Sequence, residues 1–146
     1  QKAKETGLEP YLFLALIRQE SLFDAHAVSP ANAFGLMQLL PTTAARLAKE
    51  LGLPQPTAEN LFDPELNLTL GTFYLRELLR LYGNDPVKAL AAYNAGENAA
   101  ARWESQILTD DPDEFIERIT YRETLQYVKL VLRGQRLYRA LYADQK

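Results

Sequence analysis

Apolar residues recur at spacings of three and four along most of the chain, and the runs that they form begin with similar signals. An acidic residue followed by proline opens four of them, at Glu9-Pro10, Asp63-Pro64, Asp85-Pro86 and Asp111-Pro112. A carboxylate can accept hydrogen bonds from the unpaired N–H groups of a first helical turn, and proline suits the first helical position. The pattern therefore predicts a chain of helices.

The predicted helices cover most of the sequence. They run over Pro10 to Phe23, Pro41 to Leu51, Pro64 to Tyr82, Pro86 to Ala95, Glu97 to Trp103 and about Arg122 to Tyr142, with a short turn from Pro112. Sustained alternation of Val, Ile and Thr is scarce, so the one strand expected is a short one near Ile107 to Thr109. The fold class predicted is all-α, or mainly α, with long connectors at Asp24 to Leu40 and Gly52 to Asp63.

Composition indicates an ordinary globular chain. With 146 residues, 47% apolar and 24% charged, residues 1–146 are expected to form a single domain. The net charge of −3 lacks the basic excess that binding to a phosphate backbone requires, so nucleic acid is not an expected partner. Without cysteine and with one histidine, the chain has no thiolate nucleophile and no Cys- or multi-His metal site, so no metal is expected.

The longest stretch without a formal charge lies between Asp24 and Arg46. It contains Pro30 and Pro41 together with Asn32 and Gly35, a combination that a membrane span does not carry, so no transmembrane segment is expected. The chain begins at Gln1 without an apolar signal segment, and we expect it to be excised or processed from a longer chain.

A carboxylate lies on the apolar stripe of the first predicted helix. Phe13, Leu16, Ile17 and Glu20 fall at i, i+3, i+4 and i+7. If Glu20 faces the core, desolvation and the negative end of the helix dipole favour its protonated form, which a general acid requires. The alternative is that Glu20 lies at the edge of the stripe and reaches solvent.

The connector after this helix, Ala27 to Pro41, is rich in small residues and poor in charge, as an ordered loop would be. Ser29 and Gln38 are neutral hydrogen-bonding groups suited to a carboxyl group or a sugar hydroxyl, and Gly35 permits a positive φ or a close backbone approach. Turn chemistry alone is the alternative explanation for each.

Four motifs in order extend this interpretation over most of the chain. They are Ile17-Arg-Gln-Glu-Ser-Leu-Phe23, Ser29 followed by Gly35-Leu-Met-Gln38, Ala91-Ala-Tyr-Asn-Ala-Gly96, and Tyr121-Arg-Glu-Thr-Leu-Gln-Tyr-Val128. Together they resemble the soluble lytic transglycosylase family, with its lysozyme-like catalytic domain. The resemblance runs from about Leu8 to Tyr142.

The resemblance implies a lysozyme-like domain with a substrate cleft between the Glu20 helix and the segments of Tyr93 and Glu123. It also implies cleavage of the β-1,4 bond between N-acetylmuramic acid and N-acetylglucosamine, leaving 1,6-anhydro muramic ends. Glu20 matches the glutamate that acts first as acid and then as base. No cofactor is implied; the partner is the glycan strands of peptidoglycan, and the location a bacterial periplasm or envelope. The oligomeric state stays open.

The resemblance assigns substrate-binding roles to four further residues. Ser29 matches a serine near the catalytic carboxyl group, Gln38 a glutamine that lines the sugar site, Tyr93 a tyrosine near the catalytic centre, and Glu123 a glutamate of the terminal helix. For Tyr93, core packing is an equally open alternative.

Periodicity adds an independent expectation for the terminal helix. Glu123, Tyr127, Leu130 and Gly134 form a helical stripe that is expected to face the rest of the fold. Core packing is the alternative for Tyr127 as well.

Other residues are given modest roles. Asn32 stands where the family often has glycine, and we expect it to adopt a left-handed conformation, which asparagine tolerates. Asp24 and His26 are expected to make local contacts or to be solvated. Trp103 is expected to pack in the core, and a sugar-stacking surface is the alternative.

Two other functions remain open. A hydrolase of lysozyme type would use a positioned water and a second carboxylate, with Asp24 and Glu123 as candidates. A non-catalytic glycan-binding or assembly module would keep the cleft without turnover.

Overall fold

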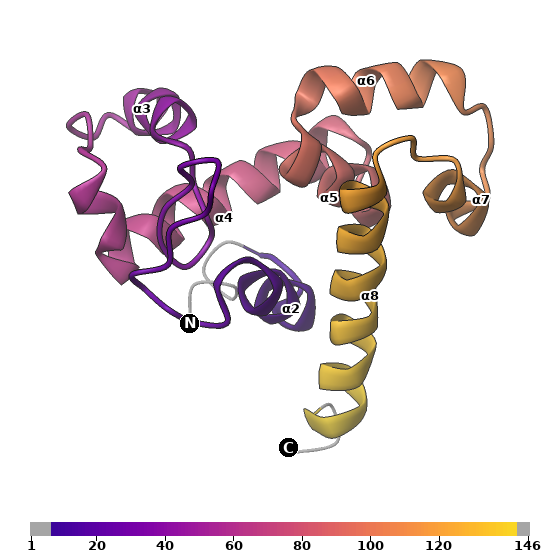
Figure 1. Ribbon diagram of the computed structural model, residues 1–146, viewed down its shortest axis with the longest axis horizontal. Helices are drawn as coiled ribbons and strands as arrows, with labels where there is room; N and C mark the ends of the chain where they lie inside the picture. The colour runs from indigo at the N-terminus through magenta and orange to yellow at the C-terminus, as the bar shows by residue number, and fades with distance from the viewer. Residues whose placement is uncertain (1–6, 143–146) are drawn as a thin grey trace. The chain divides into compact units, whose positions relative to one another are not determined.

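The computed structural model describes residues 7–142, which form a set of helices (Figure 1). In chain order these are α2 (Pro10–Ser21), α3 (Pro41–Glu50), the 3-10 helix η1 (Glu59–Phe62), α4 (Pro64–Leu81), α5 (Pro86–Ala95), α6 (Glu97–Gln106), α7 (Pro112–Glu117) and α8 (Arg122–Tyr142). Residues 7–142 contain no strand, and the isolated bridges found there join Val28 to Phe34 and Phe34 to Leu39. The all-α prediction is confirmed.

The four acidic residues predicted to open helices do so with their side chains. Each accepts a hydrogen bond from a backbone N–H in the first turn: Glu9 from Leu12 at 2.6 Å, Asp63 from Glu65 at 3.1 Å, Asp85 from Val87 at 2.9 Å and Asp111 from Asp113 at 3.0 Å. These bonds satisfy N–H groups that have no partner within the helix.

Several predicted boundaries and one predicted element differ from the structure. The helix that begins at Glu97, for example, runs to Gln106, three residues past its predicted end. The first helix ends at Ser21, two residues before the predicted end, because Leu22 and Phe23 adopt left-handed φ angles of 52° and 62°. The strand predicted near Ile107 to Thr109 is wrong. A strand needs a hydrogen-bonded neighbour, and the part of the chain that the structure describes supplies none to these residues.

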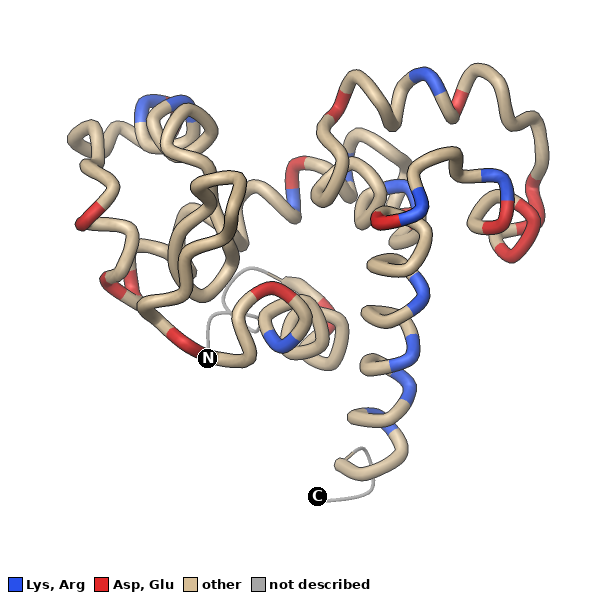
Figure 2. The backbone as a smooth tube through the Cα atoms, viewed as in Figure 1, with Lys and Arg blue, Asp and Glu red and all other residues tan. Residues whose placement is uncertain are grey.

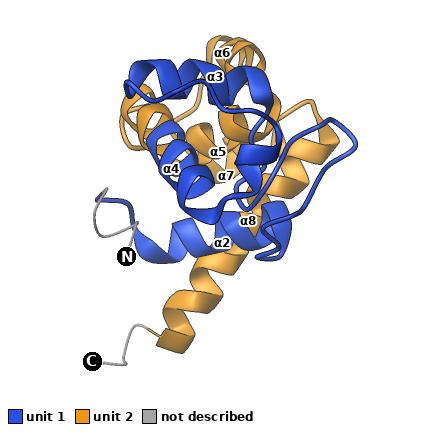
Figure 3. Cartoon of the chain, turned by 90° about the vertical axis from the view of Figure 1, so that its left-hand side faces the viewer, with its two compact units in different colours: residues 1–74 blue, residues 75–146 orange. Residues whose placement is uncertain are grey.

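The chain divides into two compact units, residues 1–74 and residues 75–146 (Figure 3). The division falls within α4, so this helix contributes its N-terminal part to the first unit and its C-terminal part to the second.

The first unit contains α2, α3, η1 and the beginning of α4. Its fully buried side chains include Leu16, Leu47, Leu61 and Leu70, which belong to four different elements and so draw all of them into one core. The Arg46 guanidinium lies 5.6 Å from the centre of the Tyr74 ring, which joins α3 to α4.

In the second unit, α5 packs against α6 and α8, and α7 packs against α8. Lysine and arginine recur along α8 (Figure 2), and Lys129 pairs with Glu117 of α7 at 2.6 Å. Arg133, Arg136 and Arg139 of α8 are exposed.

Candidate functional site

Glu20 lies on the last turn of α2, one residue before the helix ends. Its side chain is half-buried. Glu20 is therefore neither enclosed in the core nor fully solvated, which is intermediate between the two alternatives given for it. The helix ends with the Leu22 N–H donating to the Arg18 carbonyl at 2.9 Å, and the two left-handed residues Leu22 and Phe23 then turn the chain away. Strained conformations of this kind concentrate at functional sites.

Ser21, the neighbour of Glu20, connects α2 to the loop that follows. Its hydroxyl donates to the Leu36 carbonyl oxygen at 2.8 Å and lies 3.1 Å from the Ile17 carbonyl oxygen. Because Ser21 is buried, this bond replaces contacts with water and fixes the end of the Glu20 helix against the loop.

Ser29 closes a tight turn in that loop. Its oxygen accepts from the Ala33 N–H at 3.1 Å, and its own N–H donates to the Ala33 carbonyl at 3.0 Å. Asn32, inside the turn, has a φ of 59°, so the left-handed conformation predicted for it is confirmed. These bonds to Ala33 are the turn contacts that the alternative explanation of Ser29 predicts. A role of Ser29 beside the catalytic carboxyl group stays a prediction.

Gln38 turns its amide back into the same loop. Its Nε2 donates to the carbonyl oxygens of Ala27 at 3.1 Å and Gly35 at 2.9 Å. Gln38 itself has a φ of 52°, and its N–H also donates to Gly35. The donor end of the amide therefore holds the loop, and the contact of Gln38 with a sugar stays a prediction.

Asn67 is a residue that the sequence analysis did not single out. It lies on α4, is 1% exposed, and donates or accepts three hydrogen bonds, to Phe34, Met37 and Leu61. A signal was present in the sequence, because Asn67 lies on a helical stripe with buried Leu70 and Tyr74. A polar residue on an apolar stripe is the same feature that drew attention to Glu20.

The other residues near Glu20 behave as expected. The Asp24 carboxylate accepts from the His26 N–H at 2.9 Å, which confirms a local contact for Asp24. His26 is exposed, and its ring stacks on Phe62 with the centroids 5.4 Å apart.

In the second unit, Tyr93 and Glu123 lie on α5 and α8, and their neighbours in sequence meet. The Thr124 hydroxyl donates to Asn94 Oδ1 at 2.7 Å, and Thr124 is 2% exposed. Tyr93 is half-buried and Glu123 is exposed. The substrate-binding roles of both residues stay predictions.

The stripe predicted for α8 is corrected in part. Tyr127 and Gly134 are buried, but Glu123 and Leu130 are exposed, and Thr124, Val128 and Val131 are buried instead. The buried face is centred about a residue further along the helix, because α8 packs on α5 and α7 along that side.

Trp103 packs in the core, as expected. It is 2% exposed, its ring nitrogen donates to the Thr120 hydroxyl at 2.8 Å, and its ring meets Tyr121 edge-on at 5.0 Å. With its polar atom already bonded, Trp103 serves the fold of this unit.

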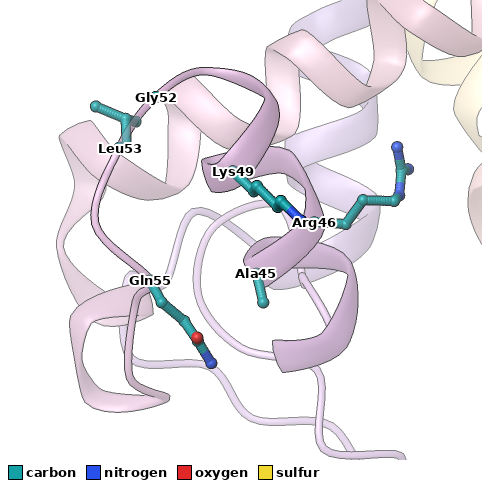
Figure 4. Close-up of a pocket in the computed structure, with 6 residues that line it drawn as sticks. All are labelled: Ala45, Arg46, Lys49, Gly52, Leu53 and Gln55. Carbon is teal, nitrogen blue, oxygen red and sulfur yellow. The ribbon is translucent and has the colours of Figure 1, made fainter.

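A groove of about 690 Å³ lies between α3 and the segment that follows it (Figure 4). Its lining is Ala45, Arg46, Lys49, Gly52, Leu53 and Gln55, which includes none of the predicted site residues. Arg46, which lines the groove, is paired with Glu50 of the same helix at 2.8 Å.

Across residues 7–142 there is no cluster of three or more His, Cys, Asp or Glu side chains that could hold a metal ion. In the same range, no helix has the length and hydropathy needed to cross a membrane.

Comparison with known proteins gives consistent matches. The family model of the transglycosylase SLT domain matches residues 1–116. The soluble lytic murein transglycosylase of Escherichia coli K12 is 37% identical over 134 residues, covering 90% of this chain and 21% of that protein. The chain thus spans about a fifth of the length of this relative.

Solved structures agree. The 70-kDa soluble lytic transglycosylase of Escherichia coli matches with a TM-score of 0.91 and 34% identity, over 99% of this chain and 24% of that one. An inactive glutamate-to-glutamine mutant of the lytic transglycosylase Slt from Pseudomonas aeruginosa matches with a TM-score of 0.90 and 34% identity, with the same coverage.

Proposed function

Because this chain belongs to the transglycosylase SLT domain family, we propose that it acts as a lytic transglycosylase on peptidoglycan. The bond cleaved is the β-1,4 linkage between N-acetylmuramic acid and N-acetylglucosamine, and the product carries a 1,6-anhydro muramic end. Residues 1–146 are the catalytic domain, and the substrate places its work in the bacterial periplasm or envelope.

The observation that carries this proposal is the position of Glu20. Glu20 is half-buried on the last turn of α2, and the adjacent Ser21 joins that turn to the loop at Leu36. The bond between this helix end and the compact loop holds the backbone of Glu20 in place, as the positioning of an acid–base group requires.

One carboxyl group suffices for the chemistry. Glu20 in its acid form protonates the glycosidic oxygen, and the bond from that oxygen to the muramoyl C1 breaks. The carboxylate so formed takes the proton of the muramoyl C6 hydroxyl as its oxygen attacks C1. Glu20 thereby regains its proton, no water is consumed, and no cofactor takes part.

A relative supports the need for a glutamate. The Pseudomonas aeruginosa protein with one glutamate replaced by glutamine is described as inactive. The same replacement at Glu20 removes the transferable proton and nearly keeps the shape of the side chain.

The other site residues take supporting roles. The Ser29 oxygen accepts from the Ala33 N–H, so its O–H is directed elsewhere and is suited to donate to the Glu20 carboxylate. Gln38 offers its amide oxygen to a sugar hydroxyl. Tyr93 and Glu123 bind the glycan from α5 and α8.

The test is mass analysis of muropeptides released from purified peptidoglycan by the wild-type chain and by two variants. Glu20→Gln is the test variant, and Glu59→Gln, at an exposed position of η1, is a control with the same chemical change. We expect products one water lighter than reducing-end forms from the wild type and from Glu59→Gln, and none from Glu20→Gln.

Other outcomes decide between the alternatives. Reducing ends would identify a hydrolase and direct the search to a second carboxylate. Binding of glycan without release would identify a binding module. Turnover by Glu20→Gln at the wild-type rate would contradict the single-glutamate mechanism.

A further inference from the structure

The first unit contains a buried polar side chain that belongs to no catalytic assignment. Asn67 is 1% exposed and lies on the first half of α4, four residues before Gly71 and so on the same face of the helix. A buried amide is costly unless its polar atoms are paired, so its partners indicate what it does.

Both ends of the Asn67 amide bind one short turn. Its oxygen accepts from the Met37 N–H at 2.8 Å, and its nitrogen donates to the Phe34 carbonyl at 2.9 Å. The turn from Phe34 to Gln38, called here the 34–38 turn, is therefore held at two backbone groups by one side chain. The nitrogen also donates to the Leu61 carbonyl at 2.9 Å, at the end of the preceding segment.

The shape of the turn fits this side chain. Gly35 has a φ of 81°, and a Cβ added there would collide with Asn67 and with the Leu61 carbonyl oxygen. One turn along α4, a Cβ added to Gly71 would collide with the fully buried Met37 side chain. The two glycines leave the room in which the 34–38 turn lies against α4.

Gln38 depends on the same turn. It has a left-handed φ of 52°, and its side chain and backbone N–H both donate to Gly35, the residue that lies against Asn67. A left-handed conformation outside glycine is unfavourable by itself, so contacts of the turn must maintain it.

We propose that Asn67 is a positioning residue, which holds the 34–38 turn against α4 and thereby sets the place of Gln38 in the glycan site. The inference rests on the proposed function, because it assigns Gln38 to that site. Only an amide fits both sets of partners, since it offers one acceptor to Met37 and two donor hydrogens to Phe34 and Leu61.

Asn67→Asp is the sharpest test variant. It keeps the size of the side chain and the acceptor for the Met37 N–H, but it replaces the two donor hydrogens with an oxygen that faces two carbonyl oxygens. The control is Thr72→Val on the same helix. Thr72 is also 1% exposed, but its hydroxyl bonds only within α4, to the carbonyls of Leu68 and Thr69.

Two measurements are made on each folded variant, in the full 146-residue chain. Hydrogen exchange followed by NMR reports the protection of the Met37 and Gln38 amides, and initial rates on purified peptidoglycan give kcat and KM. We expect Asn67→Asp to speed exchange at both amides by about tenfold or more and to lower kcat/KM by a similar factor. Thr72→Val should change neither by more than about twofold.

Each result has a clear meaning. Unchanged protection of Met37 in Asn67→Asp overturns the inference, and so does faster exchange with unchanged kcat and KM. An equal loss of kcat/KM in Thr72→Val also overturns it, because a general loss of stability then explains the effect. If Asn67→Asp does not fold, Asn67→Ser, which leaves room for a bridging water, is measured in the same way and judged by the same results.

The proposed function fails separately. If the wild-type chain releases no muropeptides, the proposed function is lost and the positioning role is lost with it. If the wild type is active and the Asn67 variants change exchange and kcat/KM no more than the control does, the proposed function stands and the positioning role of Asn67 is wrong.

Discussion

The hydroxyl of Ser21, the last residue of α2, donates to the carbonyl oxygen of Leu36 across a separation of 15 residues at 2.8 Å. Ser21 follows Glu20 directly, so the residue beside the proposed acid is the one that joins its helix to the loop. The position of Glu20 therefore depends on a bond that Glu20 does not make.

Replacing Ser21 tests this connection. Ser21→Ala leaves the Leu36 carbonyl without its donor, and we expect a loss of about 1 to 3 kcal/mol in the free energy of unfolding, measured in urea. Ser105→Ala is the control, because its hydroxyl also donates to a carbonyl, that of Arg102, but is exposed. The control should change stability by about 0.5 kcal/mol or less; equal losses in the two variants would contradict a special role for Ser21.

Gly35→Ala should be far more damaging than Gly52→Ala. Both glycines have a positive φ, of 81° and 69°, so both variants bear the left-handed strain of about 1 to 2 kcal/mol. At Gly35 the new methyl group also collides with Asn67 and Leu61, whereas nothing lies within 4 Å of a Cβ at Gly52. We expect Gly35→Ala to cost about 1 to 3 kcal/mol more in chemical unfolding. A smaller difference between the two variants would mean that α4 shifts readily to make room for the added methyl group.

Ser29→Ala should reduce turnover less than Glu20→Gln. In the proposed site Ser29 supports the reacting group, and it closes a turn with Ala33, so its loss is expected to lower kcat by about ten- to a hundredfold. Glu20→Gln removes the proton that is transferred and should leave no measurable release of anhydro-muropeptides. The two variants are compared by initial rates on the same peptidoglycan. Equal losses would give Ser29 a more direct part in the reaction.

Thr124→Val tests the hydrogen bond between Thr124 and Asn94, the residues that follow Glu123 and Tyr93 in the sequence. The change keeps the shape of the buried side chain but leaves Asn94 without the donor that lies 2.7 Å away, so unfolding should become easier by about 1 to 3 kcal/mol. We also expect KM for peptidoglycan to rise, because Asn94 and Tyr93 are adjacent on α5. A wild-type KM in this variant would show that the hydrogen bond between Thr124 and Asn94 does not affect glycan binding.

Stability at high pH should depend on Tyr82. Burial, assisted by the charges of Glu104 and Glu97, raises the pKa of Tyr82 above its ordinary value of 10.0. Above about pH 10 the unfolded chain therefore releases this proton more readily than the folded chain, and the free energy of unfolding falls as pH rises. Tyr82→Phe should lose less stability than the wild type between neutral pH and the alkaline range in urea titrations. Parallel pH profiles would contradict the shift.

The helices were predictable because their signals are local. The carboxylates of Glu9, Asp63, Asp85 and Asp111 each bond to an N–H two or three residues away, so the sequence contains both partners side by side. The strand near Ile107 failed for the opposite reason, since a strand depends on a neighbour that residues 107–109 themselves do not contain.

The candidate site was predictable in its residue types and less so in their contacts. Glu20, Ser29 and Gln38 were found from a stripe, a loop composition and a family resemblance. The donor atoms of Gln38, however, bind the loop carbonyls of Ala27 and Gly35, and periodicity alone did not place Glu123, which is exposed on α8.

The sequence by itself determined the helix starts, the all-α class and the chemical groups available at the site, because capping and periodicity act within a turn or two of the chain. Only the tertiary structure decided how the loop after Glu20 is held. Ser21 reaches 15 residues ahead to Leu36, and Asn67 reaches back 30 and 33 residues to Met37 and Phe34. Such pairs form because burial removes water as a partner for these polar groups, and that burial exists only once the chain has folded.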